Sequence, residues 1–370
     1  MKLALVTNMI PPYRAPVFER LAQLVPEFRV FTFSEMEKNR QWAAPGRGGF
    51  EAEVLGGRHL YFARRDWALH LNCGVYRALL RYRPEVVIVG GYDNPGCWLA
   101  LAAARQIGAR VVLWSGSHAH SARARRGVVP LLKRLFVRSC DAYFAYGSLA
   151  AEYLVSLGAP RERVVAGVNA VDTQAFRHRT VGRAEVRSAH SSGDAPVVCF
   201  SGQLIQRKGL DLLLQAMQRV SADARLWVIG DGPLRRKYEE LAASLLPGRV
   251  TFLGARPYRE LPDLYGAADL LVMPSLLEVW GLVVNEAMAV GLPVVVSCTA
   301  GAAPDLVEGK GTGFTVDPND VGALASAIDR LVRDPELRAD MGRRAQELIE
   351  GCGTDRYAAD MLRAAELARA

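Results

Sequence analysis

The sequence has no uninterrupted apolar run long enough to cross a membrane. Its longest apolar stretch, Cys97 to Trp114, is broken by Arg105, Gln106 and Arg110. A membrane-spanning helix needs about 18 or more consecutive apolar residues. The opening segment, Met1 to Asn8, has an apolar run shorter than the core of a secretion signal. We therefore expect no transmembrane helix, no secretion signal and a cytoplasmic location.

Cysteine is scarce, and its spacing forms no recognisable site. The few cysteines lack a C-x-x-C pair and mostly lie in apolar segments, as reduced core thiols do. They are Cys73, Cys97, Cys140, Cys199, Cys298 and Cys352. Paired Asp or His residues at the spacing of a divalent-metal site are also lacking. We therefore expect a reducing compartment, no bound metal and no resident cofactor.

Acidic residues are sparse in the first half of the chain. Residues 1–178 carry 24 Lys and Arg against 13 Asp and Glu, whereas residues 179–370 carry 22 against 25. The net charge of +8 therefore originates in the N-terminal half. No helix-turn-helix, zinc-finger or RNA-binding signature accompanies this charge, so we expect no nucleic-acid partner. An anionic membrane surface or a phosphorylated acceptor fits the basic half better.

The remaining composition is that of a globular protein. Hydrophobic residues make up 50% of the chain and charged residues 23%, which excludes a disordered or fibrous protein. A length of 370 residues allows about two domains, each with its own core.

Strand-like and helix-like patterns alternate in two blocks. The first block contains the predicted strands Lys2–Thr7, Arg29–Phe33, Glu85–Val89, Arg110–Trp114, Ala142–Ala145 and Arg163–Ala166. The second contains Pro196–Ser201, Arg225–Ile229, Arg249–Phe252, Asp269–Met273, Pro293–Val296 and Gly313–Val316. This alternation predicts an α/β protein with two Rossmann-like, doubly wound domains facing across a cleft. The predicted parts are an N-terminal domain (1–178), a linker (179–195), a C-terminal domain (196–350) and a final helix (351–370) that packs back toward the N-terminal domain.

Two glutamates separated by seven residues stand where a strand meets a helix. Glu278 lies in the loop after the strand that ends at Met273, and Glu286 lies inside the predicted helix Gly281–Val290. At such a corner the helix N-terminus attracts an anion, while carboxylates accept sugar hydroxyls. The alternative is a pair of ordinary solvated helix acids.

Three glycine-containing turns follow other strands of the second block. In the segment Gly202–Gly209, the first glycine lets the backbone approach a ligand and Lys208 supplies a compact positive charge for a diphosphate. The turn Gly230–Pro233 either lines the same pocket or is purely structural. The segment Thr299–Val307 offers backbone N–H groups to phosphate or sugar, and a plain turn is the equal alternative.

Polar residues also follow the strands of the N-terminal half. Asp93, His118 and His120 lie just after predicted strands, and Arg14 lies in a proline-stiffened loop. We expect the first three at an acceptor site, with His118 as the candidate for proton transfer. Arg14 is a candidate to reach across the cleft to a phosphate. Solvated loop histidines and an exposed surface arginine are the alternatives.

One helical segment combines a basic edge with an apolar stripe, Val128 to Phe136. The basic residues are Arg123, Arg125, Arg126, Lys133, Arg134 and Arg138. This pattern is typical of a helix that lies on anionic lipid. A core-facing helix with a solvated basic face is the alternative.

Taken in order, the second-block motifs resemble the donor half of retaining glycosyltransferases with the GT-B fold, specifically the family-4 group. The motifs are Gly202–Gly209, Gly230–Pro233, Phe252–Gly254, Glu278-x7-Glu286 and Gly291–Val295. The N-terminal half is similar in layout and in the segments Ala142–Ser148 and Val171–Phe176.

This resemblance implies that the C-terminal domain binds a nucleotide-diphosphate sugar and that the N-terminal domain holds a hydroxyl acceptor, a lipid-linked or polysaccharide intermediate being the candidate. It implies that Lys208 contacts the diphosphate, Glu278 the sugar hydroxyls and Glu286 the ribose. The catalytic candidates are His118, Lys208 and Glu278. The donor-site candidates are Gly202, Gln203, Arg207, Lys208, Gly230, Glu278, Gly281, Leu282 and Glu286.

Gln203 departs from the family pattern, which usually has arginine there, so Arg207 or Arg14 would supply the missing charge. Glycosyl transfer builds charge on the leaving diphosphate, and fixed cations and amides can stabilise it without a metal. The resemblance further implies that the departing phosphate takes the acceptor proton on the same face. The alternatives are a nucleotide-sugar epimerase or hydrolase on the same scaffold, and a non-catalytic nucleotide-sugar-binding subunit.

Overall fold

Parallel strands alternate with helices along the computed structural model, which describes residues 1–35, 48–62, 67–121, 127–190, 192–220 and 223–370. The chain divides into two compact units. Unit 1 contains Met1–Val168 and Thr354–Ala370, and unit 2 contains Asn169–Gly353. Each unit has its own parallel sheet, so the predicted α/β fold class with two doubly wound sheets is confirmed.

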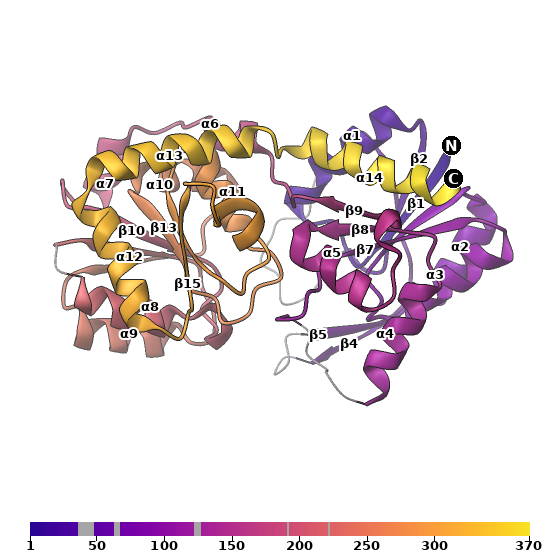
Figure 1. Cartoon of the computed structure of the whole chain (residues 1–370), viewed down its shortest axis with the longest axis horizontal. Coiled ribbons are helices and arrows are strands. Elements are labelled where there is room, and N and C mark those ends of the chain that lie inside the picture. The colour runs from indigo at the N-terminus through magenta and orange to yellow at the C-terminus, as the bar shows by residue number, and fades with distance from the viewer. Residues whose placement is uncertain (36–47, 63–66, 122–126, 191, 221–222) are drawn as a thin grey trace. The chain divides into compact units, whose positions relative to one another are not determined.

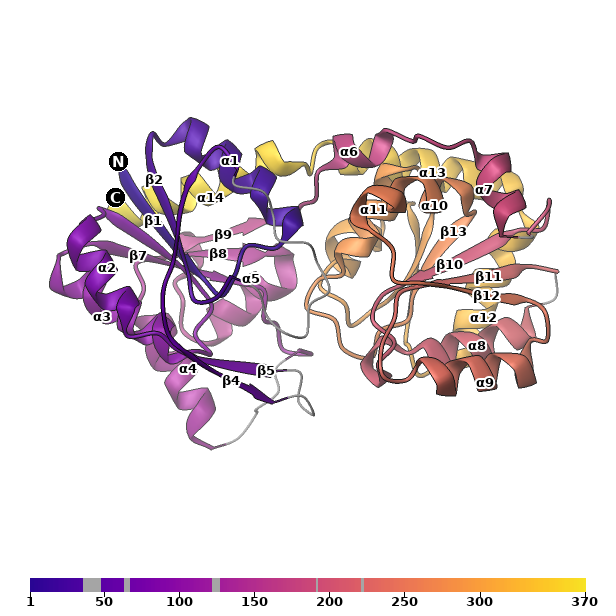
Figure 2. The ribbon, with the colours of Figure 1, turned by 180° about the vertical axis from the view of Figure 1, so that it is seen from behind.

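Unit 1 is built on a seven-stranded parallel sheet in the order β3-β2-β1-β6-β7-β8-β9. Its strands are β1 (Lys2–Thr7), β2 (Glu27–Thr32), β3 (Glu51–Val54), β6 (Val86–Gly90), β7 (Arg110–Ser115), β8 (Ala142–Tyr146) and β9 (Val164–Gly167). Its helices are α1 (Ala15–Leu24), α2 (Gly74–Tyr82), α3 (Pro95–Gln106), α4 (Val128–Arg138), α5 (Gly147–Ser156) and α14 (Thr354–Arg369). Helices α1 and α14 cover one face of the sheet, and α2 and α3 cover the other (Figure 1, Figure 2). Because both faces are covered, the central strands are continuous apolar runs.

Unit 2 is built on a six-stranded parallel sheet in the order β12-β11-β10-β13-β14-β15. Its strands are β10 (Val197–Ser201), β11 (Arg225–Ile229), β12 (Val250–Gly254), β13 (Leu270–Met273), β14 (Val294–Ser297) and β15 (Gly313–Val316). Its helices are α6 (Thr173–Arg177), α7 (Arg183–Ala189), α8 (Leu210–Arg219), α9 (Arg235–Leu245), α10 (Leu261–Ala267), α11 (Leu282–Ala289), α12 (Val321–Arg333) and α13 (Pro335–Glu350). Helices α8, α9 and α12 cover one face, and α7, α10, α11 and α13 cover the other (Figure 2). The core between the sheet and helices α8, α9 and α12 includes the fully buried Leu213, Val228 and Ile328.

The segment predicted as a linker, residues 179–195, folds as part of unit 2. It contains α7, whose Arg187 pairs with Asp269 just before β13 and donates a 3.0 Å hydrogen bond to the Ala267 carbonyl. Asp269 also accepts a 2.7 Å bond from the Val197 amide. These long-range polar contacts hold a segment that lacks an apolar pattern, and the unit boundary lies at Val168, before the predicted boundary at residue 178.

The C-terminal helix α14 belongs to unit 1, where it contacts α1, β7, β8 and β9. Its Tyr357 is 1% exposed and accepts a 2.8 Å hydrogen bond from Trp114 Nε1. The Tyr357 ring also packs edge-on against Phe144 at 4.9 Å. The final helix predicted for residues 351–370 corresponds to α14.

Two strand pairings lie outside the predicted pattern. Strand β3 extends the first sheet, and β4 (Arg58–Phe62) and β5 (Trp67–Leu71) form a separate antiparallel pair. Among the described residues, no helix is both long and apolar enough to cross a membrane.

Candidate active site

The candidate donor residues lie at the point of the second sheet where the order of successive strands reverses, between β10 and β13. From β10 the sheet continues through β11 and β12 on one side and through β13 to β15 on the other. Ligands of open parallel sheets bind at the carboxyl ends of the strands on either side of such a switch point. The loop that begins at Gly202 follows β10, and the loop that contains Glu278 follows β13. The sheet topology therefore brings the two predicted motifs to one edge.

The two glycine turns after β10 and β11 pack backbone against backbone. The amide of Gly202 donates to the Ile229 carbonyl at 2.9 Å, and the amide of Leu204 donates to the Asp231 carbonyl at 2.9 Å. At Gly230, φ is +128°, and an added Cβ would lie 2.0 Å from the Gly202 oxygen. Glycine is required here for close approach of the two loops, so Gly230 acts on the site through its backbone.

Lys208 and Glu278 form an ion pair between the loops that follow β10 and β13. Their side chains are 16% and 11% exposed, and Ser275 Oγ donates to the same carboxylate at 3.3 Å. Burial raises the pKa of Glu278, but the Lys208 ammonium, with help from Arg207 and Ser275, more than offsets this and lowers the pKa below its ordinary value. Glu278 is therefore held ionised beside a partly buried cation.

Further backbone contacts tie these two loops together. The amide of Leu276 donates to the Arg207 carbonyl at 2.9 Å, and a Cβ at Gly209 would lie 2.3 Å from the Pro274 oxygen. Gly281 precedes α11 with φ +99°, and Leu282 opens that helix. Gln203 and Arg207 are partly exposed on the first loop.

Glu286 lies inside α11, and a buried tyrosine contacts its carboxyl. Tyr265 of α10 donates a 3.1 Å hydrogen bond to Glu286 Oε2, and its oxygen is 2.8 Å from Ser201 Oγ at the end of β10. Burial raises the pKa of Glu286 to about 7, although the Tyr265 hydrogen bond lowers it in part. Neither Tyr265 nor Ser201 was a candidate from the sequence, although Ser201 directly precedes the glycine loop.

The small-residue segment after β14 supports the Glu278 loop with its backbone. Gly301 N donates to the Glu278 carbonyl at 3.4 Å, and Ala302 N donates to the Trp280 carbonyl at 3.1 Å. A Cβ at Gly301 would lie 2.1 Å from the Val279 oxygen. These two amides are used within the protein, which favours the plain structural turn over the ligand-binding alternative.

Arg14 is buried among aromatic side chains of unit 1, and is not the exposed surface arginine of the alternative. Its side chain is buried, with 3% of the residue exposed. Its guanidinium carbon lies 4.9 to 5.3 Å from the ring centroids of four aromatic residues. They are Tyr13, Trp114, Tyr146 and Tyr357. Cation–π contacts hold the Arg14 guanidinium between the loop after β1 and helix α14. The role of Arg14 at a phosphate stays a prediction.

The other N-terminal candidates follow two neighbouring strands. Asp93 is exposed after β6, and His118 and the exposed His120 follow β7, with ring centroids 6.0 Å apart. His118 is 1% exposed, and its backbone N–H donates to Ser121 Oγ at 2.9 Å. Their assignment to an acceptor site, and the catalytic role of His118, stay predictions.

The switch point of the first sheet lies between β1 and β6, and two asparagines meet there. Asn94 Nδ2 donates to Asn8 Oδ1 at 3.1 Å, joining the loops that follow these strands. Nearby, Lys133 of α4 is 8% exposed, with its ammonium 5.1 Å from the Tyr92 ring centroid. Lys133 therefore faces the core and is not part of a basic surface edge. The predicted edge residues Arg123, Arg125 and Arg126 lie outside the described residues.

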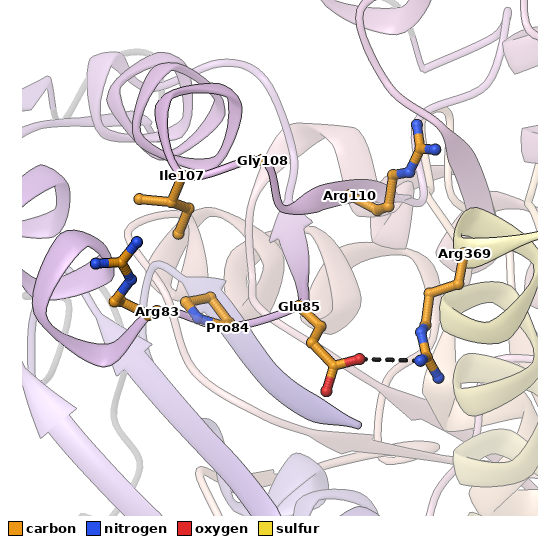
Figure 3. A pocket seen from close by; sticks show the side chains of 7 residues that line it. All are labelled: Arg83, Pro84, Glu85, Ile107, Gly108, Arg110 and Arg369. Carbon is orange, nitrogen blue, oxygen red and sulfur yellow. Dashed lines mark ion pairs between the residues drawn. The ribbon is translucent and has the colours of Figure 1, made fainter.

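A surface pocket of about 390 Å³ lies at the opposite end of the first sheet, beside the amino ends of β6 and β7 (Figure 3). Its lining residues are Arg83, Pro84, Glu85, Ile107, Gly108, Arg110 and Arg369. Two of its three guanidinium groups are already paired, Arg369 with Glu85 at 3.0 Å and Arg110 with Asp141 at 3.2 Å. None of the predicted site residues lines it. Within the described part of the chain, no group of three or more His, Cys, Asp or Glu residues is arranged to hold a metal ion.

The fold and the loop geometry define the class: both units match solved glycosyltransferases of the GT-B fold. The structure of Anabaena Alr3699/HepE in complex with UDP superposes with a TM-score of 0.79 over 98% of this chain and 99% of that one, at 19% sequence identity. The structure of WaaG, a glycosyltransferase involved in lipopolysaccharide biosynthesis, superposes with a TM-score of 0.69 at 17% identity, over 98% of each chain.

Sequence comparison identifies the family. The model of the family Glycosyl transferases group 1 matches residues 183–348. The GDP-mannose-dependent alpha-(1-6)-phosphatidylinositol monomannoside mannosyltransferase of Mycolicibacterium smegmatis is 30% identical over 92% of this chain and 91% of that protein. Sulfoquinovosyl transferase SQD2 of Arabidopsis thaliana is 29% identical over 81% of this chain and 61% of its own length. This chain belongs to the Glycosyl transferases group 1 family.

Proposed function

We propose that this protein is a retaining, metal-independent glycosyltransferase of the family-4 group that moves a sugar from a nucleotide-diphosphate sugar to a hydroxyl acceptor. The observation that carries the proposal is the Lys208–Glu278 ion pair at the switch point between β10 and β13. A ligand that brings its own diphosphate can replace the carboxylate as the partner of the ammonium. Glu278 is then available to accept sugar hydroxyls.

The remaining donor contacts follow from the chemistry of the neighbouring groups. Arg207, whose positive charge helps to lower the pKa of Glu278, adds charge at the diphosphate next to the neutral Gln203. The backbone at Gly202 lets phosphate oxygens approach closely. Glu286, on the helix that begins after Gly281, accepts a ribose hydroxyl.

Transfer breaks the bond between the anomeric carbon and the diphosphate oxygen. Positive charge develops on the sugar and negative charge on the diphosphate, where Lys208 stabilises it. The leaving oxygen takes the acceptor proton on the face from which it departs, so the new glycosidic bond forms on that face and the anomeric configuration is retained. The donor is a co-substrate, and the proposal includes no resident cofactor.

The acceptor is proposed to be a lipid-linked or polysaccharide intermediate held by the N-terminal unit. The names of relatives support this class, since one refers to a phosphatidylinositol monomannoside. Another relative, from Rhizobium meliloti, is named a lipopolysaccharide core biosynthesis glycosyltransferase. Asp93 and His118 follow β6 and β7 at the edge where an acceptor of unit 1 would bind.

Helix α4 is proposed to rest on an anionic membrane surface. Five of its large apolar side chains are 45% to 67% exposed: Val128, Val129, Leu131, Leu132 and Leu135. Its buried side is formed by Lys133, Phe136 and Val137, so five of its seven Val, Leu and Phe side chains face solvent. The exposed Arg134 and Arg138 on the same helix attract acidic headgroups, which favours a lipid surface over a neutral protein partner.

Donor binding and transfer test the proposal directly. A bound donor raises the melting temperature with the logarithm of its concentration, so a panel of nucleotide sugars can be screened by thermal shift. Lys208→Ala and Glu286→Ala are each expected to cut transfer at least tenfold, while the control Lys237→Ala, at an exposed position on α9, leaves it unchanged. Near-wild-type transfer by both site variants contradicts the assignment. Epimerised or hydrolysed donor without acceptor supports the alternative enzyme class.

Three further measurements test retention, independence from metal and membrane docking. The product is expected to keep the anomeric configuration of the donor by NMR, and turnover is expected to persist in excess EDTA. The double variant Leu131→Glu/Leu135→Glu is expected to lose flotation with phosphatidylglycerol vesicles, whereas the control Leu24→Glu, at an exposed leucine of α1, keeps it. Wild-type protein that stays in the soluble fraction contradicts membrane docking.

A further inference from the structure

Tyr265 connects the end of β10 to the carboxylate on α11. Its hydroxyl oxygen lies 2.8 Å from Ser201 Oγ and 3.1 Å from Glu286 Oε2. Tyr265 has no exposed surface, and Glu286 is 8% exposed. Three elements that are separate in the sequence, β10, α10 and α11, therefore meet at one phenol.

Packing fixes the phenol ring of Tyr265 independently of its hydroxyl. Phe176 of α6 stacks on the ring at 6.1 Å with an interplanar angle of 17°, and Tyr258 packs edge-on against Phe176 at 5.2 Å. A ring held in this way can direct its hydroxyl without support from a ligand. Removing the hydroxyl alone should therefore leave the packing intact.

The hydrogen atoms can be assigned from the groups involved. An ionised carboxylate only accepts hydrogen bonds, so the Tyr265 O–H points to Glu286 Oε2 and the phenol oxygen accepts from the Ser201 hydroxyl. Among the residues that the structure describes, only Tyr265 donates a hydrogen bond to the Glu286 carboxyl. Oε1 is left for a ligand hydroxyl.

We propose that Tyr265 is a positioning residue for donor binding, which holds Glu286 Oε2 so that the carboxylate stays ionised and Oε1 accepts a ribose hydroxyl of the nucleotide. The proposal rests on the proposed function, since it needs a nucleotide ligand at this site. Tyr265 acts through Glu286 and does not itself touch the ligand.

Few groups determine the charge on Glu286. Burial raises its pKa to about 7, and the Tyr265 hydrogen bond is the opposing contribution. Helices α6 and α13 and strands β13 and β14 also contact α11, but none of their described side chains is an ion-pair or titrating partner of the Glu286 carboxyl. On β10, Cys199 acts on the Tyr265 hydroxyl and not directly on Glu286. The phenol is thus the group whose removal changes the protonation of Glu286.

The test is the pH dependence of nucleotide binding by Tyr265→Phe. Loss of a hydrogen bond to a charged group corresponds to about one pKa unit. If the pKa of Glu286 rises by that amount, the ionised fraction at pH 7 falls about fivefold, and the affinity for UDP or GDP falls with it. At pH 9 the carboxylate is mostly ionised in both proteins, so the variant is expected to bind nearly as well as the wild type. A purely structural defect gives no such recovery.

Calorimetric titrations of the full chain with UDP and GDP at pH 6, 7, 8 and 9 measure this effect. The matched control is Tyr238→Phe, which removes a buried hydroxyl from the same unit that has no hydrogen-bond partner among the described residues. Ratios of variant to wild type cancel the titration of the nucleotide phosphates. Ser201→Ala is expected to shift the affinity in the same direction by a smaller factor.

The outcomes separate this proposal from the proposed function. Wild-type binding together with equal affinities of Tyr265→Phe and Tyr238→Phe at every pH overturns the role of Tyr265 and leaves the function standing. A loss by Tyr265→Phe that is the same at pH 7 and pH 9 also overturns it. No binding of any nucleotide diphosphate or nucleotide sugar by the wild type contradicts the proposed function itself.

Discussion

Replacing Glu286 with glutamine is expected to stabilise unit 2 while it weakens nucleotide binding. Burial raises the pKa of Glu286 from an ordinary value of 4.5 to about 7. Each pKa unit corresponds to about 1.4 kcal/mol of difference between the two protonation states. The raised pKa therefore lowers the stability of the folded state by about 3 kcal/mol at pH 8, where the buried carboxylate is ionised, and by about 1 kcal/mol at pH 5, where only the unfolded chain is largely ionised. Glutamine has nearly the same shape, carries no charge and keeps an oxygen that can accept from Tyr265.

The direction in which stability changes with pH follows from the raised pKa of Glu286. The contribution of this group to stability is fully present below pH 4.5, where the carboxyl is protonated in the folded and the unfolded chain. It is lost as the pH rises toward and through 7. Replacing Glu286 with glutamine should thus raise the free energy of unfolding most at alkaline pH.

Urea unfolding of wild type and Glu286→Gln at pH 5 and pH 8 measures the difference. The matched control is Glu308→Gln, because Glu308 is exposed and should change stability little at either pH. We expect a gain at pH 8 that is at least twice the gain at pH 5, together with weaker binding of UDP or GDP. A loss of stability at pH 8, or an equal change at both pH values, refutes the argument that Glu286 is held at an energetic cost for binding.

Three further predictions concern other parts of the molecule. Lys208→Met leaves the Glu278 carboxylate buried without its cation and should lower the free energy of unfolding, measured with urea, by about 3 kcal/mol. Adding Glu278→Gln to this variant should restore the stability, but a transfer assay should show no return of activity. Gly230→Ala should cost about 3 kcal/mol and abolish nucleotide binding, because its Cβ meets the backbone of the neighbouring loop. Gly248→Ala, also at positive φ but with open space around it, should cost only about 1 kcal/mol and leave binding unchanged. Arg14→Ala should destabilise unit 1 by about 3 kcal/mol in thermal unfolding with no change in nucleotide affinity, and a selective loss of affinity would contradict its structural role.

The sequence was sufficient to predict both sheets, because parallel strands covered on both faces are continuous apolar runs. Strand β3 (Glu51–Val54) was missed for the converse reason. It is an edge strand that pairs with β2 through its backbone and keeps its side chains mostly exposed, so it needs no apolar pattern. Helix α7 was missed because its place is set by the bond network between Arg187 and Asp269, far apart in the sequence.

The meeting of Lys208 and Glu278 was predictable from local motifs, whereas the role of each site residue stays a prediction. Lys208 and Glu278 come from two such motifs, and the sheet topology brings them together. Tyr265 contacts Glu286 because α10 and α11 pack side by side, which no local spacing encodes. The burial of Arg14 was missed for the same reason, since its aromatic cage is assembled from distant parts of unit 1.

Hydrogen–deuterium exchange of the full chain with and without saturating UDP or GDP tests the central claim most directly. If the loops after β10 and β13 bind a nucleotide diphosphate, the nucleotide is expected to protect backbone amides from exchange in the segments that contain Gly202–Gly209 and Ser275–Glu286. Lys208→Ala should abolish this protection. Protection confined to the arginine-lined pocket around Arg83 and Arg110, or protection that persists unchanged in Lys208→Ala, would contradict the account.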